Sequence, residues 1–587
     1  MLEQVLAESP AWVFDASVAA NLATDTAGTT PVSAAGQTVA FMSDLSGNGH
    51  HATQATAASR PVYRGVPRTL GPELSPAFST WTLPTGWSES AGVLTKTAGT
   101  ANAASGAIAF NAGSTYMVVL NITRTAGTLT IRTAGGTAVI GHGNNSSRST
   151  IWVFTAGAGN TAIELSADAS FAGTVTKCSV REVLTMTNFG VAFDGQDDLL
   201  QTNAIDLSGS NKATVSTMLR WHGGQGASSR AYDAGNYTPG AGNGSFYMGR
   251  QSQNLGFCDG ATICTANQPL NEVEGLLRGA QAQINTLSLD RAGATIADQI
   301  KCRERGHEVT LTTAGVALDD EGLANGVLSI GGANNGLYDF YGLFGRQVGF
   351  SGAATPEQIA IFEAYCREGY AIGAVLGDST TAACGISFGQ SSDNWRVSSL
   401  VGGLIVNGAD ISKPGDRIAN QLAAWTALTG KAALDVVIVG GFVNDIKGRC
   451  GALPTPTPIA TVLGDLQDLI DTIKADAPQV KVVVLAASPC RGWMDGTAPT
   501  GPTPADDPAA AYAAWLAYNE AIAGNGANAI TGVDARVTGF VDEIGDVDGY
   551  LLAVYDNNGD GVHEDNAARF IIAQEIRTAL ESLGLVS

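Results

Sequence analysis

The pattern of apolar residues changes near residue 370, and this change constrains the fold of the 587-residue chain more than any other feature. Before it, short apolar and β-branched runs are separated by Gly, Asn and Asp, which is typical of all-β domains. These runs include Thr115–Asn121, Thr128–Arg132, Ile151–Phe154, Thr214–Trp221 and Gly326–Ile330. After it, strand-like runs alternate with amphipathic helical runs. This second pattern predicts a doubly wound parallel sheet, with sites at the carboxyl ends of its strands.

The C-terminal pattern predicts five strands and three clear helices. The expected strands are Ala371–Leu376, Gly403–Val406, Leu434–Val439, Lys481–Ala486 and Ala529–Val533. The expected helices are Ile459–Ala475, Ala509–Ala523 and Asn566–Leu583. At roughly 150 residues per domain, the length predicts two to four domains in the whole chain.

Composition excludes several classes of protein. Hydrophobic residues make up 44% and charged residues 15%, so the chain has enough apolar surface to fold. The formal charge of -22 disfavours nucleic acid and anionic membrane surfaces as partners. Apolar runs fall short of the roughly 20 residues that span a bilayer, which predicts no membrane insertion. The first residues lack a basic segment followed by an apolar one, so we expect no standard secretory signal peptide.

Metal and disulfide signals are weak. Eight cysteines in a chain of this length do not form a disulfide framework. Two pairs, Cys258 with Cys264 and Cys450 with Cys490, remain open as alternatives, either bonded as disulfides or free. No Cys/His cluster has zinc spacing. The run Asp556–Gly561 imitates the first half of a calcium loop, but Ala567 stands where a bidentate Glu is required. We therefore expect no metal.

The N-terminal region carries motifs of a known β-fold. They are Asp44–Thr53, Phe193–Leu199, Leu328–Gly332 and Thr355–Gln358, the last of which opens a helix expected to reach about Ile372. These motifs resemble a concanavalin A-like (laminin-G-like) lectin jelly roll. More than a hundred residues separate the first motif from the second. The resemblance therefore implies a jelly roll split into residues 1–69 and 184–370.

The segment between the two halves, residues 70–183, resembles an inserted carbohydrate-binding β-sandwich. Aromatic faces stack on sugar rings, which makes Trp87 the first candidate for sugar binding, ahead of Trp81 and Trp152. The alternative is that these tryptophans belong to the core. His50 and His51 follow a Gly-Asn-Gly turn, and we expect them to be incidental.

One serine lies where a nucleophile of the parallel sheet would be expected. Ser379 follows Gly377 and Asp378 directly after the first strand, at the carboxyl end of the sheet. Three further blocks follow it along the chain. They are Asn407–Asp416, Gly440–Asp445 and Asp560–His563.

These four blocks, in this order, resemble the SGNH (GDSL-type) hydrolase family over residues 371–587. The resemblance implies a three-layer α/β, flavodoxin-like fold. It makes Ser379 the nucleophile, His563 the general base and Asp560 its orienting carboxylate. It also assigns the oxyanion hole to the Ser379 and Gly415 backbone N–H groups and the Asn444 side-chain amide.

The residue chemistry agrees with these roles. A serine needs a neighbouring base, and imidazole suits that task near neutral pH. His563 is the only histidine after His307. A carboxylate three residues before it, at Asp560, can accept the Nδ1 proton and leave Nε2 facing the serine.

The third block departs from the family pattern. The family usually carries glycine two residues before its asparagine, whereas both Phe442 and Val443 separate Gly441 from Asn444 here. The alternative is that Asn444 and Asp445 only cap the following helix. The segment Pro499–Pro508 follows the fourth strand and is expected to form part of the rim of the site.

These features predict a carbohydrate esterase that removes acyl groups, O-acetyl above all, from a polysaccharide without a cofactor. The split jelly roll with its insert resembles phage receptor-binding tail proteins, which implies a virion protein acting on bacterial surface polysaccharide, with other tail proteins or further copies of the chain as partners. The alternatives are a non-catalytic adhesin or structural spike, and a secreted bacterial polysaccharide esterase acting outside the cell.

Overall fold

The computed structural model divides the chain into two compact units. The smaller unit contains Gly65–Thr187, and the larger contains Met1–Arg64 and the described residues from Asn188 onward. The structure describes residues 1–135, 139–142, 148–194, 197–221, 228–234, 246–251, 254–259, 262–266, 282–304, 307–309, 311–314, 323, 325–332, 340–378, 405–410, 416–428, 430–447, 457–498, 505, 507–553, 556, 564 and 566–586.

The N-terminal part of the larger unit is built from two antiparallel sheets. The first contains β1 (Trp12–Asp15), the end of β14 (Ala172–Asp194), β26 (Tyr341–Ser351), β16 (Lys212–Trp221), β21 (Ala282–Asp290), β22 (Ile300–Glu304) and β23 (His307–Val309). The second contains β2 (Leu22–Ala23), β3 (Phe41–Met42), β4 (Ala52–Thr53), β15 (Leu200–Ile205), β25 (Gly326–Ile330), β17 (Ser228–Ala234), β18 (Phe246–Gln251), β19 (Asn254–Asp259), β20 (Thr262–Ala266) and β24 (Leu311–Ala314). The all-β prediction is confirmed at this level, while the jelly-roll topology stays a prediction.

One core holds these two sheets together. Its buried side chains come from both sheets, for example Phe14 and Val215 from the first and Tyr232 and Leu328 from the second. The Trp12 ring lies across β26, where a Cβ on Gly349 would come within 2.0 Å of it. Only glycine therefore allows the ring to lie there, and the Trp12 Nε1 donates to the Gln347 side chain at 2.9 Å.

The smaller unit is also a pair of antiparallel sheets. One contains β5 (Val62–Glu73), β6 (Trp87–Ser90), β7 (Val93–Lys96), β9 (Thr115–Ala126), β12 (Arg148–Thr155) and the first part of β14. The other contains β11 (Val139–His142), β10 (Leu129–Ala134), β13 (Ala162–Ala167) and β8 (Asn102–Ala107). A buried core of aromatic and aliphatic side chains lies within the unit. β5 leads into it and β14 leads out of it, and these two strands pair with each other.

A capped helix precedes the C-terminal domain. α4 (Pro356–Arg367) begins at the Thr355 N-cap, whose side chain and that of Gln358 form a capping box. The helix ends at Arg367, so the expected extension to Ile372 is wrong. The chain instead enters β27 (Ala371–Leu376), whose Ile372 N–H donates to the Asp435 carboxylate at 2.8 Å.

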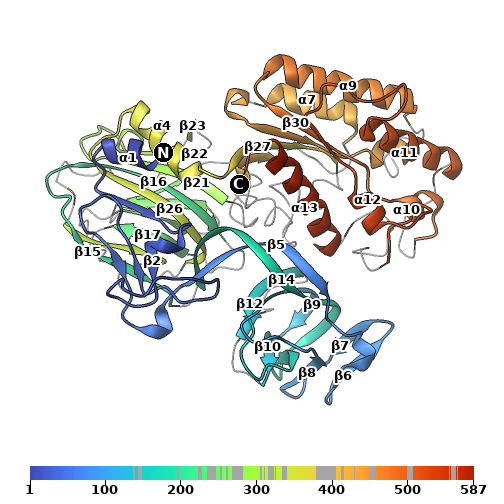
Figure 1. The fold of residues 1–587 in the computed structure, drawn as a ribbon, viewed down its shortest axis with the longest axis horizontal. Helices are drawn as coiled ribbons and strands as arrows, with labels where there is room; N and C mark the ends of the chain where they lie inside the picture. Colours follow the sequence, from blue (N-terminus) through green and yellow to red (C-terminus); the bar gives the residue numbers. More distant parts are fainter. Residues whose placement is uncertain are drawn as a thin grey trace. The chain divides into compact units, whose positions relative to one another are not determined.

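The C-terminal domain is the predicted parallel sheet. Its order is β28 (Ile405–Asp410), β27, β29 (Val436–Val439), β30 (Lys481–Leu485) and β31 (Ala535–Val537), with every pair parallel. Helices α7 (Ile418–Ala427) and α9 (Ile459–Asp476) lie on one side of the sheet and α13 (Asn566–Ser582) on the other (Figure 1). The domain also contains α8 (Val443–Lys447), α10 (Arg491–Asp495), α11 (Pro508–Ala523) and α12 (Phe540–Ile544).

Two predicted strands are displaced. The last strand was expected at Ala529–Val533 but begins at Ala535, because Gly532 turns the chain with a φ of +74°. The second strand was expected at Gly403–Val406, whereas β28 continues to Asp410. Part of the Asn407–Asp416 block therefore lies within the strand rather than after it.

Candidate active site

The sheet order places one pair of strand ends at the centre of the domain. If the five strands are numbered by their order along the chain, they lie in the sheet in the order 2-1-3-4-5. The connection that follows β27 therefore runs towards one edge of the sheet, and the connection that follows β29 runs towards the other edge. Ligands of such sheets bind at this switch point, beyond the carboxyl ends of the strands. β27 and β29 end at Leu376 and Val439, and the Gly440 N–H donates to the Leu376 carbonyl at 2.9 Å.

Asp378 joins the ends of these two strands. Its Oδ2 atom accepts the backbone N–H groups of Phe442 at 3.0 Å and Val443 at 3.1 Å. Gly441 has a φ of +83°, and a Cβ there would come within 2.6 Å of the Asp378 backbone nitrogen. The glycine of the third block is therefore required by a close approach of two backbones.

The turn at Gly441 is supported from two other elements. Gln421 on α7 donates its side-chain amide to the Gly440 carbonyl at 3.0 Å. Tyr518 on α11 donates to the Gly441 carbonyl at 3.4 Å, and its ring stacks on that of Phe442 with centroids 4.0 Å apart. The backbone that precedes Asn444 is thus held on both sides.

Asn444 lies in the first turn of α8. Its side chain is mostly buried, and its Nδ2 atom donates to the Asp416 carbonyl at 3.1 Å. An Asn amide nitrogen carries two hydrogens, so this bond fixes the amide plane while a second N–H points elsewhere. Asn444 follows Val443 within α8, so it is not the N-cap of that helix.

Asp445 binds a different helix from the one that contains it. Its Oδ2 atom accepts the N–H of Ile418, the first residue of α7, at 3.1 Å. Burial raises the pKa of this carboxyl group to about 7, against the lowering effects of the Ile418 hydrogen bond and the Arg417 charge. The nearby Asp378 and Asp465 charges raise the pKa further. The helix-cap alternative therefore applies to Asp445, but to α7 rather than α8.

The segment that carries Asp560 and His563 has fixed ends. Asp556 and Glu564 pair as an antiparallel bridge, which brings the two flanking residues side by side. Asp560 and His563 themselves lie outside the described residues, as do Ser379 and Gly415. Their predicted roles stay predictions.

A stacked cluster follows β30 on the same edge of the sheet. The Arg491 guanidinium lies 4.5 Å from the Tyr512 ring centroid and 5.1 Å from that of Tyr550. Tyr512 stacks in turn on Trp515. The Arg491 N–H and Nη1 atoms donate to the Gly549 and Asp548 carbonyls at 3.0 and 2.9 Å. This cluster anchors the turn 545–551, while most of Pro499–Pro508, the expected rim, lies outside the described residues.

The predicted sugar-binding tryptophan lies in a core. The Trp87 side chain is 7% exposed, its Nε1 donates to Asn102 at 2.9 Å, and its ring stacks on Phe171. Trp81 is buried in the same core. A covered ring has no free face for a sugar, so we do not extend the sugar-stacking role of Trp87 to the proposal below.

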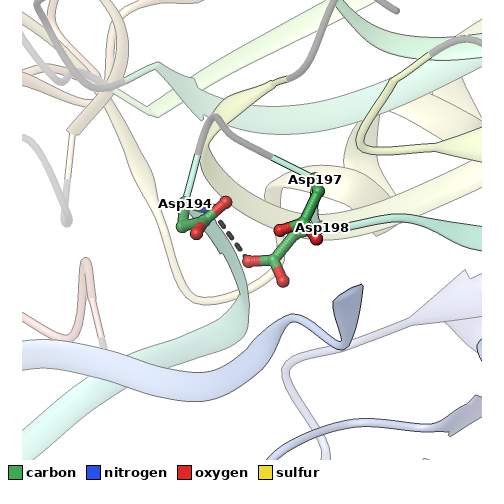
Figure 2. A group of neighbouring side chains, drawn as sticks. All are labelled: Asp194, Asp197 and Asp198. Atoms are coloured by element: carbon green, nitrogen blue, oxygen red, sulfur yellow. Dashed lines mark hydrogen bonds between the residues drawn. The ribbon is translucent and has the colours of Figure 1, made fainter. Parts of the chain in front are cut away.

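One acidic group stands out among the residues that the structure describes. Asp194, Asp197 and Asp198 have carboxylate oxygens within 4.8 Å of one another (Figure 2). Burial raises the pKa of Asp198 to about 7, and the neighbouring Asp194 charge adds to this effect. The Asp194 N–H already donates to Asp198 Oδ2 at 2.9 Å, and we assign no metal to this group. Of the calcium-like run, only Asp556 is described.

Comparisons with known proteins agree on the C-terminal domain. Residues 375–560 match the family model described as GDSL-like Lipase/Acylhydrolase. The C-terminal domain is a GDSL-type serine esterase. No helix among the described residues is long and apolar enough to cross a membrane.

Three solved structures to which the chain is similar are named here. A GDSL-like lipase from Bacteroides thetaiotaomicron has 16% identity and a TM-score of 0.26, covering 36% of this chain and 88% of its own. TesA has 21% identity and a TM-score of 0.25, covering 36% and 99%. A catalytic mutant of the acetylxylan esterase Axe2 from Geobacillus stearothermophilus has 16% identity and a TM-score of 0.26, covering 38% and 99%. No curated protein matches the chain.

The sequence-based assignment gave Asp378 no role of its own and named Asp445 only in the helix-cap alternative. Asp378 and Asp445 stand directly beside the predicted donors Ser379 and Asn444, and both are buried. The available signal was an acidic residue next to a donor at a strand end. That signal does not show which backbone groups the acid binds.

Proposed function

We propose that the chain is a carbohydrate esterase that removes O-acetyl groups from a polysaccharide. The observation that carries the proposal is the convergence of the first and third blocks at the switch point, where Asp378 binds the backbone just before Asn444. The family match over the same region supports the ester chemistry. The motifs Asp44–Thr53 and Phe193–Leu199, which resemble those of lectin jelly rolls, favour a polysaccharide as the substrate.

The proposed reaction is acyl transfer through a serine. Ser379 attacks the ester carbonyl while His563 takes its proton, and Asp560 orients the imidazole. The Ser379 and Gly415 N–H groups and the second Asn444 amide N–H stabilise the oxyanion. The ester C–O bond then breaks, and His563 gives its proton to the departing sugar hydroxyl, which leaves Ser379 acetylated. Water attacks this acyl-enzyme while His563 takes its proton, and acetate leaves as the Ser379 hydroxyl is restored. No cofactor takes part.

The setting that we propose is a phage tail, where the β-rich units hold bacterial surface polysaccharide near the esterase. Its support is the resemblance of residues 1–370 to receptor-binding tail proteins. A secreted polysaccharide esterase would show the same chemistry. Immunogold labelling of virions with an antibody to this chain separates the two settings.

Hydrolysis of p-nitrophenyl acetate and acetate release from O-acetylated polysaccharide test the proposed chemistry. We expect Ser379→Ala and His563→Ala each to lower kcat/KM by about 10³-fold or more, with thermal unfolding nearly unchanged. Retention of more than about a tenth of the wild-type rate in either variant would remove that residue from the triad. Activity on the small ester without acetate release from any polysaccharide would reject the carbohydrate substrate.

A further inference from the structure

Two buried carboxylates link the segments that carry the proposed oxyanion-hole donors. Asp378 and Asp445 are each 1% exposed. Asp378 follows β27 and binds the Phe442 and Val443 N–H groups. Asp445 lies in α8 and binds the Ile418 N–H at the start of α7.

Each of these contacts starts or ends beside a proposed donor. Asp378 directly precedes Ser379, and Val443 directly precedes Asn444. Asp445 directly follows Asn444, and Ile418 lies three residues after Gly415. Asp378 therefore connects the first block to the third, and Asp445 connects the third block to the start of α7, two residues after the second block.

The Asn444 amide completes the connection. It donates to the Asp416 carbonyl, two residues before the N–H that Asp445 binds. Two consecutive residues of α8 thus hold the chain just after Gly415. Loss of either contact would let the Asn444 amide move relative to the start of α7.

We propose that Asp378 and Asp445 are positioning residues that fix the Asn444 amide of the proposed oxyanion hole relative to the end of β27 and the start of α7. This inference rests on the proposed function. Oxyanion stabilisation depends on donors fixed in place before the reaction, and errors of about 1 Å can cost about 10²-fold in rate. Both carboxylates bind backbone N–H groups, and those of Asp378 lie just before Asn444, so we expect an effect on kcat through the position of the Asn444 amide.

Burial makes this arrangement costly to the fold. Removing a carboxylate from water is unfavourable, and the two charges lie close enough for Asp378 to raise the pKa of Asp445. An apolar side chain at either position would avoid that cost, but it could not accept a backbone N–H. The role of both side chains is therefore to accept these particular hydrogen bonds.

Steady-state kinetics with p-nitrophenyl acetate test the proposal at Asp445. We expect Asp445→Ala to lower kcat about 10- to 100-fold with KM within about threefold of wild type. Asp445→Asn keeps an acceptor for Ile418 N–H, so kcat should return to within about threefold of wild type. Asp378→Ala and Asp378→Asn should show the same contrast.

Asp534→Ala is the matched control. Asp534 also accepts a backbone N–H, that of Val482 at 2.8 Å, but it does so at the amino ends of β30 and β31. We expect this variant to unfold at a lower temperature with kcat within about twofold of wild type. Should Asp445→Ala fail to fold, Asp445→Leu fills the same space without an acceptor and replaces it.

Two results would overturn the proposal. One is a folded Asp445→Ala or Asp445→Leu enzyme with more than about a third of wild-type kcat. The other is an Asp445→Asn enzyme whose kcat is no higher than that of Asp445→Ala, because the hydrogen bond would then not be the cause.

Hydrogen exchange of the peptide 416–427 gives a readout without substrate. The exchange rate should rise in Asp445→Ala but not in Asp445→Asn. A wild type without esterase activity but with that exchange pattern would reject the proposed function while retaining the link between α7 and α8.

Discussion

At position 441, backbone conformation and packing both require glycine. The φ of +83° disfavours any side chain, and the space for a Cβ is taken by Asp378. The three residues after Gly441 bring two N–H groups to the Asp378 carboxylate and then place Asn444 in α8. The extra residue of this block, relative to the family pattern, is therefore accommodated between the Gly441 turn and the start of the helix.

Gly441→Ala should destabilise the protein by about 2 kcal/mol or more, because the new methyl group must displace the backbone of Asp378. It should also lower kcat for p-nitrophenyl acetate. Gly464→Ala is the control, since Gly464 lies in α9 with no atom within 4 Å of its Cβ position, and it should be stabilising by about 0.5–1 kcal/mol. Urea unfolding of both variants measures the difference. Equal stabilities would contradict the close approach.

The Asp445 carboxyl group makes stability depend on pH. Its pKa in the folded protein is about 7, above the value of about 3.9 expected when unfolded. Because folding raises this pKa, the contribution of Asp445 to the free energy of unfolding is fully present below pH 4 and is lost as pH rises through 7. Asp445→Asn cannot ionise, so its unfolding free energy relative to wild type should increase between pH 4 and pH 8, by at most ~4 kcal/mol.

Asp534→Asn is a control for which we expect the opposite dependence of unfolding free energy on pH. Burial raises the pKa of Asp534, but hydrogen bonds from Lys474, Val482 and Lys481 lower it overall. A lowered pKa gives stability that is present above the unfolded value and is lost in acid. Asp534→Asn should therefore destabilise more at pH 8 than at pH 3. A flat difference between Asp445→Asn and wild type across pH 4 to 8 would show that Asp445 does not titrate in this range.

At the scale of helices and strands, the local sequence pattern predicts the ends of those elements that depend on local interactions. β25 and β27 begin and end at the residues that the sequence pattern predicts. The helices α9, α11 and α13 differ from expectation by only a residue at either end. The last strand was wrong because one glycine in a left-handed conformation outweighed an apolar run. Asn444 was correctly placed after the third strand, but the Asp445 contact with Ile418 depends on the order of the strands, which no local pattern contains.

The Arg491 cluster makes a testable connection between α10, α11 and the turn 545–551. Arg491→Ala removes two cation–π contacts, each worth about 0.5–2 kcal/mol, together with the side-chain bond to the Asp548 carbonyl. Hydrogen exchange of the peptide 545–551 should therefore become faster. Tyr550→Phe keeps the ring and loses only the hydrogen bond to Asp495, so its effect should be smaller. Equal exchange in Arg491→Ala and wild type would mean that the stack does not hold the turn.

At the scale of the whole molecule, chemistry and polymer recognition are assigned to different parts of the chain. The proposed catalytic residues all follow residue 370, whereas the described residues of the smaller unit all lie within Gly65–Thr187. The smaller unit has its own core, which shares no residue with that of the larger unit. Its removal should therefore leave the esterase domain intact.

Deletion of residues 65–187, with a short Gly-Ser linker from Arg64 to Asn188, should keep kcat/KM for p-nitrophenyl acetate within about threefold of wild type. Acetate release from O-acetylated polysaccharide should fall, because tethering raises local substrate concentration without changing the chemistry. Ser379→Ala in the same background controls for hydrolysis that does not depend on the enzyme. Unchanged release from the polymer would show that this unit does not bind the substrate.

The pairing of β5 with β14 has a consequence for gene exchange. The chain enters and leaves the smaller unit through strands that pair with each other, so an in-frame exchange with breakpoints in these two strands would replace residues 65–187 as one piece. An incoming module would need only two neighbouring ends of its own, a condition that many β-sandwiches meet. The arrangement would let a population of such genes exchange the proposed polysaccharide-binding unit in a single event, without changing the proposed catalytic residues.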